Sequence, residues 1–123
     1  MSEFSDNLSD RFMKLVLGIL EIEDLMNNKY SCRHIFGQLF RAGTSAGANY
    51  EEARAGASNA DFIYKLQIVL KELRESVYWI CIISEAKLLS KEKEIHAIQT
   101  ESRELANIIA KCIYTAKSRS KKP

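Results

Sequence analysis

Apolar residues recur along this chain at alternating steps of three and four positions, which is the spacing of one face of an α-helix. Short segments separate four such stretches: "NNKYS" at 27–31, "GASN" at 56–59 and "LLSKEKE" at 88–94. The four apolar series are Leu8, Phe12, Leu15, Ile19, Ile22 and Met26; Ile35, Leu39, Ala42, Ala46, Asn49 and Ala53; Phe62, Leu66, Val69, Leu73, Ser76, Ile80 and Ile83; and Ile95, Ile98, Ser102, Leu105, Ile109, Cys112 and Ala116. The pattern predicts helices at about 6–27, 31–56, 59–89 and 91–118.

The connections between these helices are short, and the only proline is Pro123, so nothing within the chain interrupts a long helix. Short connections place consecutive helices side by side in opposite directions. We therefore expect residues 1–123 to form a single all-α domain, an antiparallel up-down-up-down four-helix bundle.

The third helix carries more apolar residues than one bundle needs. Beside its core series, apolar residues surround most of the helix near 77–83, whereas one buried face needs an arc of about 100°. Contact with another subunit would cover the excess, and a helix central to its own bundle is the alternative. The residues predicted for such an interface are Ile68, Tyr78, Trp79 and Ile82.

The segment "RAGTSAGANYEEA" at 41–53 contains G-x-S-x-G, the pattern of a serine hydrolase nucleophile elbow. That elbow needs a preceding strand and a large sheet, whereas Ser45 falls within a helical series. We interpret the small residues as a site of close helix packing, since each glycine costs up to about 1 kcal/mol of helix propensity. The residues assigned to this packing are Ala42, Gly43, Ala46, Gly47 and Asn49.

Asn49 occupies a position of the second apolar series where an apolar residue is expected. We expect a buried asparagine that forms hydrogen bonds and fixes the register of the helices, and a ligand-binding asparagine is the alternative.

No pattern of metal or nucleotide binding is present. Bundle di-iron sites use Glu-x-x-His pairs, but His34 and His96 are preceded at that spacing by Ser31 and Lys93. No G-x-x-x-x-G-K-[ST] loop occurs. We therefore expect no catalytic residues, no metal and no cofactor.

Cellular location is predicted from the cysteines and the apolar runs. The three cysteines are widely spaced, which favours reduced thiols over disulfides or zinc. The N-terminal segment is polar and acidic, and the longest apolar run spans only 77–83. A membrane-spanning helix needs about 20 such residues. We expect a cytoplasmic protein without a membrane span.

The net charge is only +2, so binding of nucleic acid would depend on local clusters of cations or on repetition in an oligomer. One candidate cluster is the C-terminal segment, whose cations also complement the dipole of a helix end. The other lies on the second and third helices. The nucleic-acid candidates are Arg41, Lys65, Lys71 and Arg74, and Lys117, Arg119, Lys121 and Lys122.

Three segments of the central region carry a family resemblance: R-x-G-T-S-x-G-A-N-x-x-E-A from Arg41 to Ala53, D-F-I-x-K-L from Asp61 to Leu66, and L-K-E-x-x-E-x-x-Y-W from Leu70 to Trp79. In them the chain resembles the bacterial 23S rRNA intervening-sequence proteins. It is also similar to the accessory variability determinant of diversity-generating retroelements. The resemblance implies a homopentamer of four-helix bundles, with a central channel and without known enzymatic activity.

In the retroelement relatives, a basic pentamer surface engages nucleic acid and a reverse transcriptase. This chain departs from them in being nearly neutral. Two functions therefore remain open: an adaptor for RNA or a nucleoprotein, and a purely protein-binding structural ring.

Overall fold

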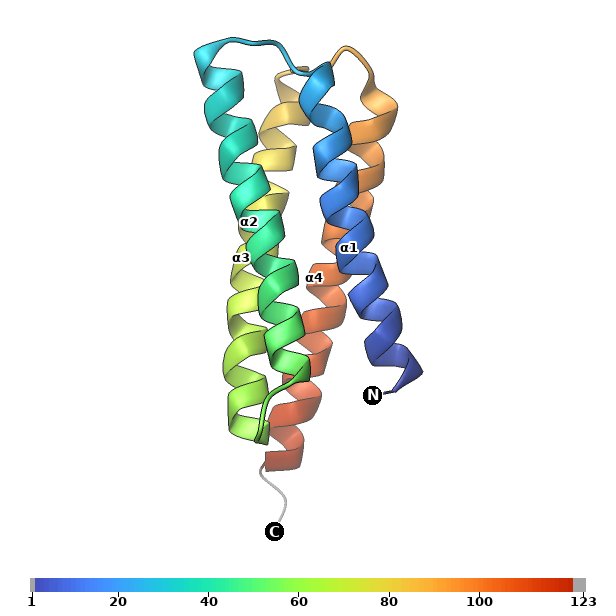
Figure 1. Ribbon diagram of the computed structural model, residues 1–123, viewed down its shortest axis with the longest axis vertical. Helices are drawn as coiled ribbons and strands as arrows, with labels where there is room; N and C mark the ends of the chain where they lie inside the picture. Colours follow the sequence, from blue (N-terminus) through green and yellow to red (C-terminus); the bar gives the residue numbers. More distant parts are fainter. Residues whose placement is uncertain (1, 121–123) are drawn as a thin grey trace.

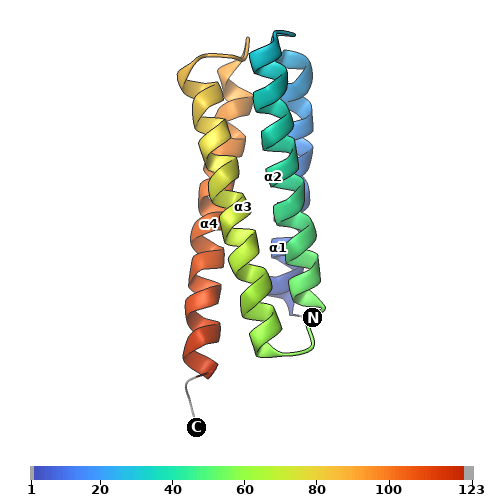
Figure 2. The same ribbon diagram turned by 90° about the vertical axis from the view of Figure 1, so that its left-hand side faces the viewer.

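The computed structural model describes residues 2–120, which form a four-helix bundle in which consecutive helices run in opposite directions (Figure 1). The helices are α1 (Glu3–Ile22), α2 (Tyr30–Arg54), α3 (Asn59–Glu85) and α4 (Glu92–Ser120). Each packs on its neighbours around the bundle: α1 and α3 both lie against α2 and α4. Turning the molecule shows α2 and α3 side by side, joined by a short loop (Figure 2).

Two serines begin helices by capping their first turns. The hydroxyl oxygens of Ser2 and Ser58 accept hydrogen bonds from the backbone N–H groups of Ser5 and Asp61, each at 3.1 Å. Such a cap satisfies one of the N–H groups that a helix start leaves without a partner. Asn59 ties α3 to the end of α4, because its side-chain amide donates to the carbonyl of Ala116 at 3.0 Å.

The first and third helices end earlier than their sequence patterns predict. After α1 the chain continues as a 3₁₀ turn, η1 (Glu23–Leu25), and Met26 then forms an isolated antiparallel bridge with Leu89 in the α3–α4 connection. At the end of α3, Lys87 has a left-handed backbone with φ of 53°, and the N–H of Leu88 returns to the carbonyl of Ile83. This geometry closes a helix end, although glycine adopts it more easily than lysine.

The core follows the predicted series along α1 and α3 and shifts on the other two helices. On α2, Tyr50 is buried while Asn49 is half-buried; on α4, Ile113 is buried while Cys112 is half-buried. The prediction of a buried Asn49 is therefore wrong. The shift is local on both helices, because Ala53 and Ala116, the next positions of the two series, are buried again.

Among residues 2–120, no helix is both long enough and apolar enough to cross a membrane.

Candidate interaction surfaces

The glycines of α2 differ in how closely they meet α1. A Cβ atom added at Gly43 would lie 2.6 Å from Cδ1 of Ile19, a distance that real Cβ atoms do not adopt, so Gly43 lets α1 approach. A Cβ at Gly47 would meet only Cβ of Phe12, at 3.8 Å, which is ordinary contact. Ala42 and Ala46 are fully buried. Close packing therefore centres on Gly43, and Gly47 lies at the edge of this contact.

A second close approach, which the sequence pattern did not single out, lies between α1 and α4. A Cβ at Gly18 would lie 2.7 Å from Cγ2 of Ile98. In the sequence, this contact is indicated by Gly18 itself, because an isolated glycine in a strongly apolar helix costs helix propensity.

Ser45 and Asn49 interact with each other within α2. The Nδ2 amide of Asn49 donates to the Ser45 carbonyl at 2.9 Å and to its hydroxyl at 3.2 Å. These hydrogen bonds stay within one helix, so Asn49 does not set the register between helices as predicted. Within residues 2–120, no group of three or more His, Cys, Asp or Glu side chains is placed to hold a metal ion.

Arg41, one of the nucleic-acid candidates, is engaged in an ion-pair network between α2 and α3. Its guanidinium donates to Glu72 at 3.0 Å and also pairs with Glu75. Trp79 donates its indole N–H to Glu75 at 3.1 Å. The hydrogen bond to Glu75 raises the pKa of Arg41, while the hydrogen bonds from Trp79 and Arg41 lower the pKa of Glu75. The charge of Arg41 is therefore balanced within the subunit.

The other basic candidates fall into three groups. Lys65 forms an ion pair with Glu52 at 2.9 Å, so its charge is also compensated. Lys71 and Arg74 are exposed on α3, and Lys117 and Arg119 are exposed near the end of α4. None of these four takes part in an ion pair among the described residues. Lys121 and Lys122 lie outside the described residues.

The predicted oligomer interface on α3 is largely packed within the subunit. Ile68, Trp79 and Ile82 are half-buried, and Trp79 lies edge-on to Tyr78 with ring centroids 5.1 Å apart. Tyr78 is 59% exposed. The assignment of these four residues to a contact with another subunit stays a prediction.

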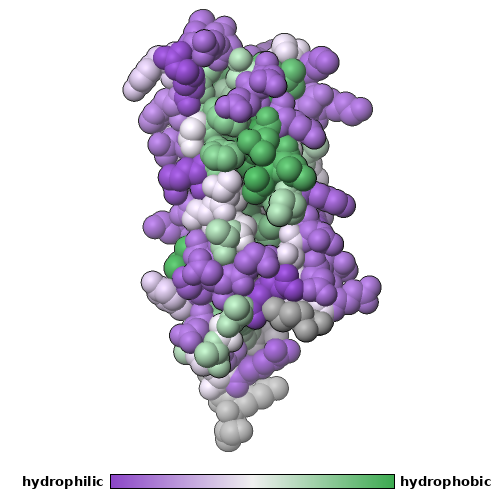
Figure 3. Space-filling model, viewed as in Figure 1, coloured by the Kyte–Doolittle hydropathy of each residue, from purple (hydrophilic) through white to green (hydrophobic). Residues whose placement is uncertain are grey.

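Exposed apolar side chains also follow one another along α1, where the sequence pattern predicts no interface. Met13, Leu17 and Leu20 are 61%, 50% and 42% exposed and follow each other at steps of four and three, beside the core series of the same helix. We call these three residues the α1 stripe. Apolar atoms gather over α1 on the face drawn in Figure 3. In the sequence, these residues form a second apolar series beside the core series of the same helix.

Comparison with known proteins supports the family resemblance. The family model described as "23S rRNA-intervening sequence protein" matches residues 7–111. A crystal structure from Bacteroides thetaiotaomicron, of a protein with unknown function from the S23 ribosomal protein family, superposes with a TM-score of 0.76 at 30% identity; the match covers 86% of this chain and 97% of that one. No curated protein matches the sequence. The bundle fold, the matched region and this structural relative lead to one conclusion: the chain belongs to the 23S rRNA-intervening sequence protein family.

Proposed function

We propose that this chain is a non-enzymatic cytoplasmic binding module that assembles into a ring of identical subunits and binds RNA, alone or within a nucleoprotein, through the basic end of α4. The supporting observation is that Lys117 and Arg119 are exposed there and form no ion pair within residues 2–120. Lys121 and Lys122 follow them in the sequence. Such cations contact phosphate without reading base sequence.

Repetition of this end in a ring would compensate for the low charge of one subunit. In a cyclic homo-oligomer with bundle axes along the symmetry axis, equivalent helix ends lie on one rim. The family resemblance implies five copies. The α1 stripe supports assembly, because adjacent exposed apolar side chains gain free energy when another subunit covers them. The ring thereby turns a weak local charge into an extended basic rim.

RNA binding is tested by fluorescence anisotropy with a structured RNA at several salt concentrations. The variant carries alanine in place of Lys117, Arg119, Lys121 and Lys122. We expect weaker binding, and a plot of log affinity against log salt whose slope is shallower by about 0.7–0.9 for each phosphate that the variant no longer neutralises. The control variant carries alanine at four other exposed lysines: Lys14, Lys29, Lys91 and Lys93.

An equal loss of affinity in both variants would indicate a general charge effect and contradict a site at the end of α4. Absence of binding at low salt would reject the RNA proposal altogether.

Assembly is tested by sedimentation of Leu17→Asp, which places a charge in the centre of the α1 stripe. We expect dissociation to smaller species while the helical circular dichroism is kept. The control is Tyr114→Asp, at an aromatic residue that is 76% exposed on α4. An unchanged Leu17→Asp oligomer would place the subunit contact elsewhere, and the α3 residues Tyr78 and Ile82 would be tested next.

The ion pairs of Arg41 and Lys65 favour a second candidate function, a ring that binds only proteins. Those pairs remove two of the eight basic candidates from the surface charge, in a chain whose net charge is only +2. If the ring assembles but shows no salt-sensitive RNA affinity, this second function becomes the better account.

A further inference from the structure

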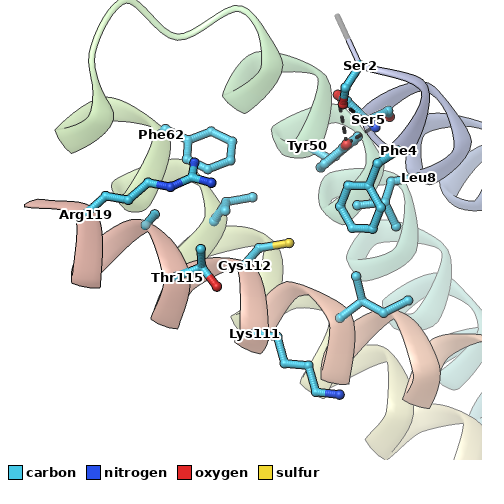
Figure 4. Close-up of a pocket in the computed structure, with 13 residues that line it drawn as sticks. Ser2, Phe4, Ser5, Leu8, Tyr50, Phe62, Lys111, Cys112, Thr115 and Arg119 are labelled. Atoms are coloured by element: carbon cyan, nitrogen blue, oxygen red, sulfur yellow. Dashed lines mark hydrogen bonds between the residues drawn. The ribbon is translucent and has the colours of Figure 1, made fainter.

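A cavity of about 530 Å³ lies beside the first turns of α1, where α1 faces the C-terminal half of α4 (Figure 4). Phe4 and Leu8 line it from α1, Ile108 and Cys112 from α4, and Phe62 from α3. Its volume is within the usual range for small-molecule sites, which is about 300–1,000 Å³. All four helices contribute to its wall, so the cavity belongs to the folded bundle.

The interior of this cavity is apolar. Two of the polar groups that line it are engaged or weakly polar: the Tyr50 hydroxyl donates to the Ser5 carbonyl at 2.9 Å, and burial raises the pKa of the Cys112 thiol. Burial of an apolar ligand against aliphatic and aromatic side chains is favourable, because it removes apolar surface from water.

The rim of the cavity is positively charged. Lys111 and Arg119 line it from α4, and no Asp or Glu residue is among its lining residues within the described chain. In Figure 4, Arg119 extends alongside Phe62, and Lys111 lies on the other side of Cys112. Neither cation belongs to an ion pair among residues 2–120. The lining therefore combines an apolar interior with two uncompensated cations.

We propose that this cavity binds a small anionic amphiphile: a medium-length aliphatic chain that ends in a carboxylate. The chain would lie among Phe4, Leu8 and Phe62, and the carboxylate would pair with Arg119, whose guanidinium lies beside Phe62 (Figure 4). This site is separate from the proposed RNA function, although Arg119 contributes to both. An arginine side chain suits a carboxylate because its planar donors match the two oxygens.

The probe is decanoate, added to the full-length protein and followed by isothermal titration calorimetry. We expect saturable binding, with an affinity that rises about fourfold for each methylene from hexanoate to decanoate. Decanol, which has the same chain without the charge, is expected to bind about tenfold more weakly, since a hydrogen bond to a charged group is stronger than one to a neutral group. Equal binding of decanol and decanoate would overturn the role of the cations.

Two variants locate the site. Cys112→Phe fills the cavity without removing a charge, so it should abolish decanoate binding and leave RNA binding unchanged. Lys111→Ala with Arg119→Ala should weaken decanoate binding about tenfold and leave decanol binding unchanged. Lys117→Ala is the matched control, because Lys117 is exposed on the same helix but does not line the cavity. Decanoate binding that survives Cys112→Phe would overturn the proposal.

Alkylation of the unmodified protein provides a test that does not depend on whether Cys112→Phe folds. Decanoate should slow the reaction of Cys112 with N-ethylmaleimide, as mapped by peptide mass spectrometry, and leave Cys81 unaffected. Equal protection of both cysteines, or of neither, would overturn the proposal. The proposal would also be overturned if Cys112 reacted only after the oligomer dissociates, because a second copy of the chain would then occupy the cavity.

Discussion

The two halves of α1 meet the bundle in different ways. In its C-terminal half, α1 approaches both neighbours closely, because Ile19 lies against Gly43 of α2 and Gly18 lies against Ile98 of α4. In its first turns, no glycine lets α1 approach α4, and the cavity beside Cys112 lies between them. One helix thus makes two close side-chain contacts and, at its start, lines an apolar cavity.

This difference shows that the glycines act as individual contacts rather than as a motif. Gly43 and Gly47 are spaced one turn apart in the sequence, yet only Gly43 meets a side chain at a distance that excludes a Cβ atom. Protein interiors are packed closely enough that a single methyl group decides such contacts. The following substitutions test the contrast along α1, from the largest expected effect to the smallest.

Gly43→Leu should have the largest effect. The added side chain would occupy the space of the Ile19 side chain, which is fully buried. We expect destabilisation of about 3 kcal/mol or more, since overpacking costs about 1–3 kcal/mol and sometimes more. Urea unfolding measures it. A variant with unchanged stability would contradict the close contact between α1 and α2.

Gly18→Ala should destabilise the protein to a smaller extent. Its Cβ would meet a branched methyl group of Ile98, and the gain of about 1 kcal/mol in helix propensity offsets part of the overpacking. We expect a net loss of up to about 2 kcal/mol in the same unfolding experiment. A gain in stability would show that the contact between Gly18 and Ile98 readily accommodates a methyl group.

Gly47→Ala should stabilise the protein by up to about 1 kcal/mol, because the new methyl group makes only ordinary contact with Phe12. Gly37→Ala is the matched control, since a Cβ there has no neighbour within 4 Å and reports helix propensity alone. If Gly47→Ala destabilised the protein while the control stabilised it, Gly47 would belong to the close contact between α1 and α2.

Cys112→Ala should have the smallest effect, which is a change in how the free energy of unfolding depends on pH. Burial raises the pKa of Cys112 above its ordinary value of 9.0, so the unfolded chain loses this proton first as pH rises. The stability contribution is therefore present below 9.0 and is lost as pH rises through the folded pKa. We expect the variant to lose less stability than the parent between a pH below 9.0 and one above it. Equal losses would show that the cavity is well hydrated.

On α2 and α3 the pattern predicts the positions of residues better than their partners. It predicts Arg41 as a basic surface residue of α2, but not that its guanidinium pairs with Glu72 across the α2–α3 contact. A pattern of helical steps shows which residues share a face of one helix. It does not show which residues of two helices meet, because that depends on the rotation and offset between them.

The sequence by itself determined the number of helices, their order and most of the core, because a period of three and four residues separates a buried face from an exposed one. The motifs of the central region also identified the family. Tertiary structure alone decided which glycines are contacts, that Tyr50 replaces Asn49 in the core, and that α1 leaves a cavity beside α4. These features depend on distances between helices, and such distances are set by the packing of all four helices together.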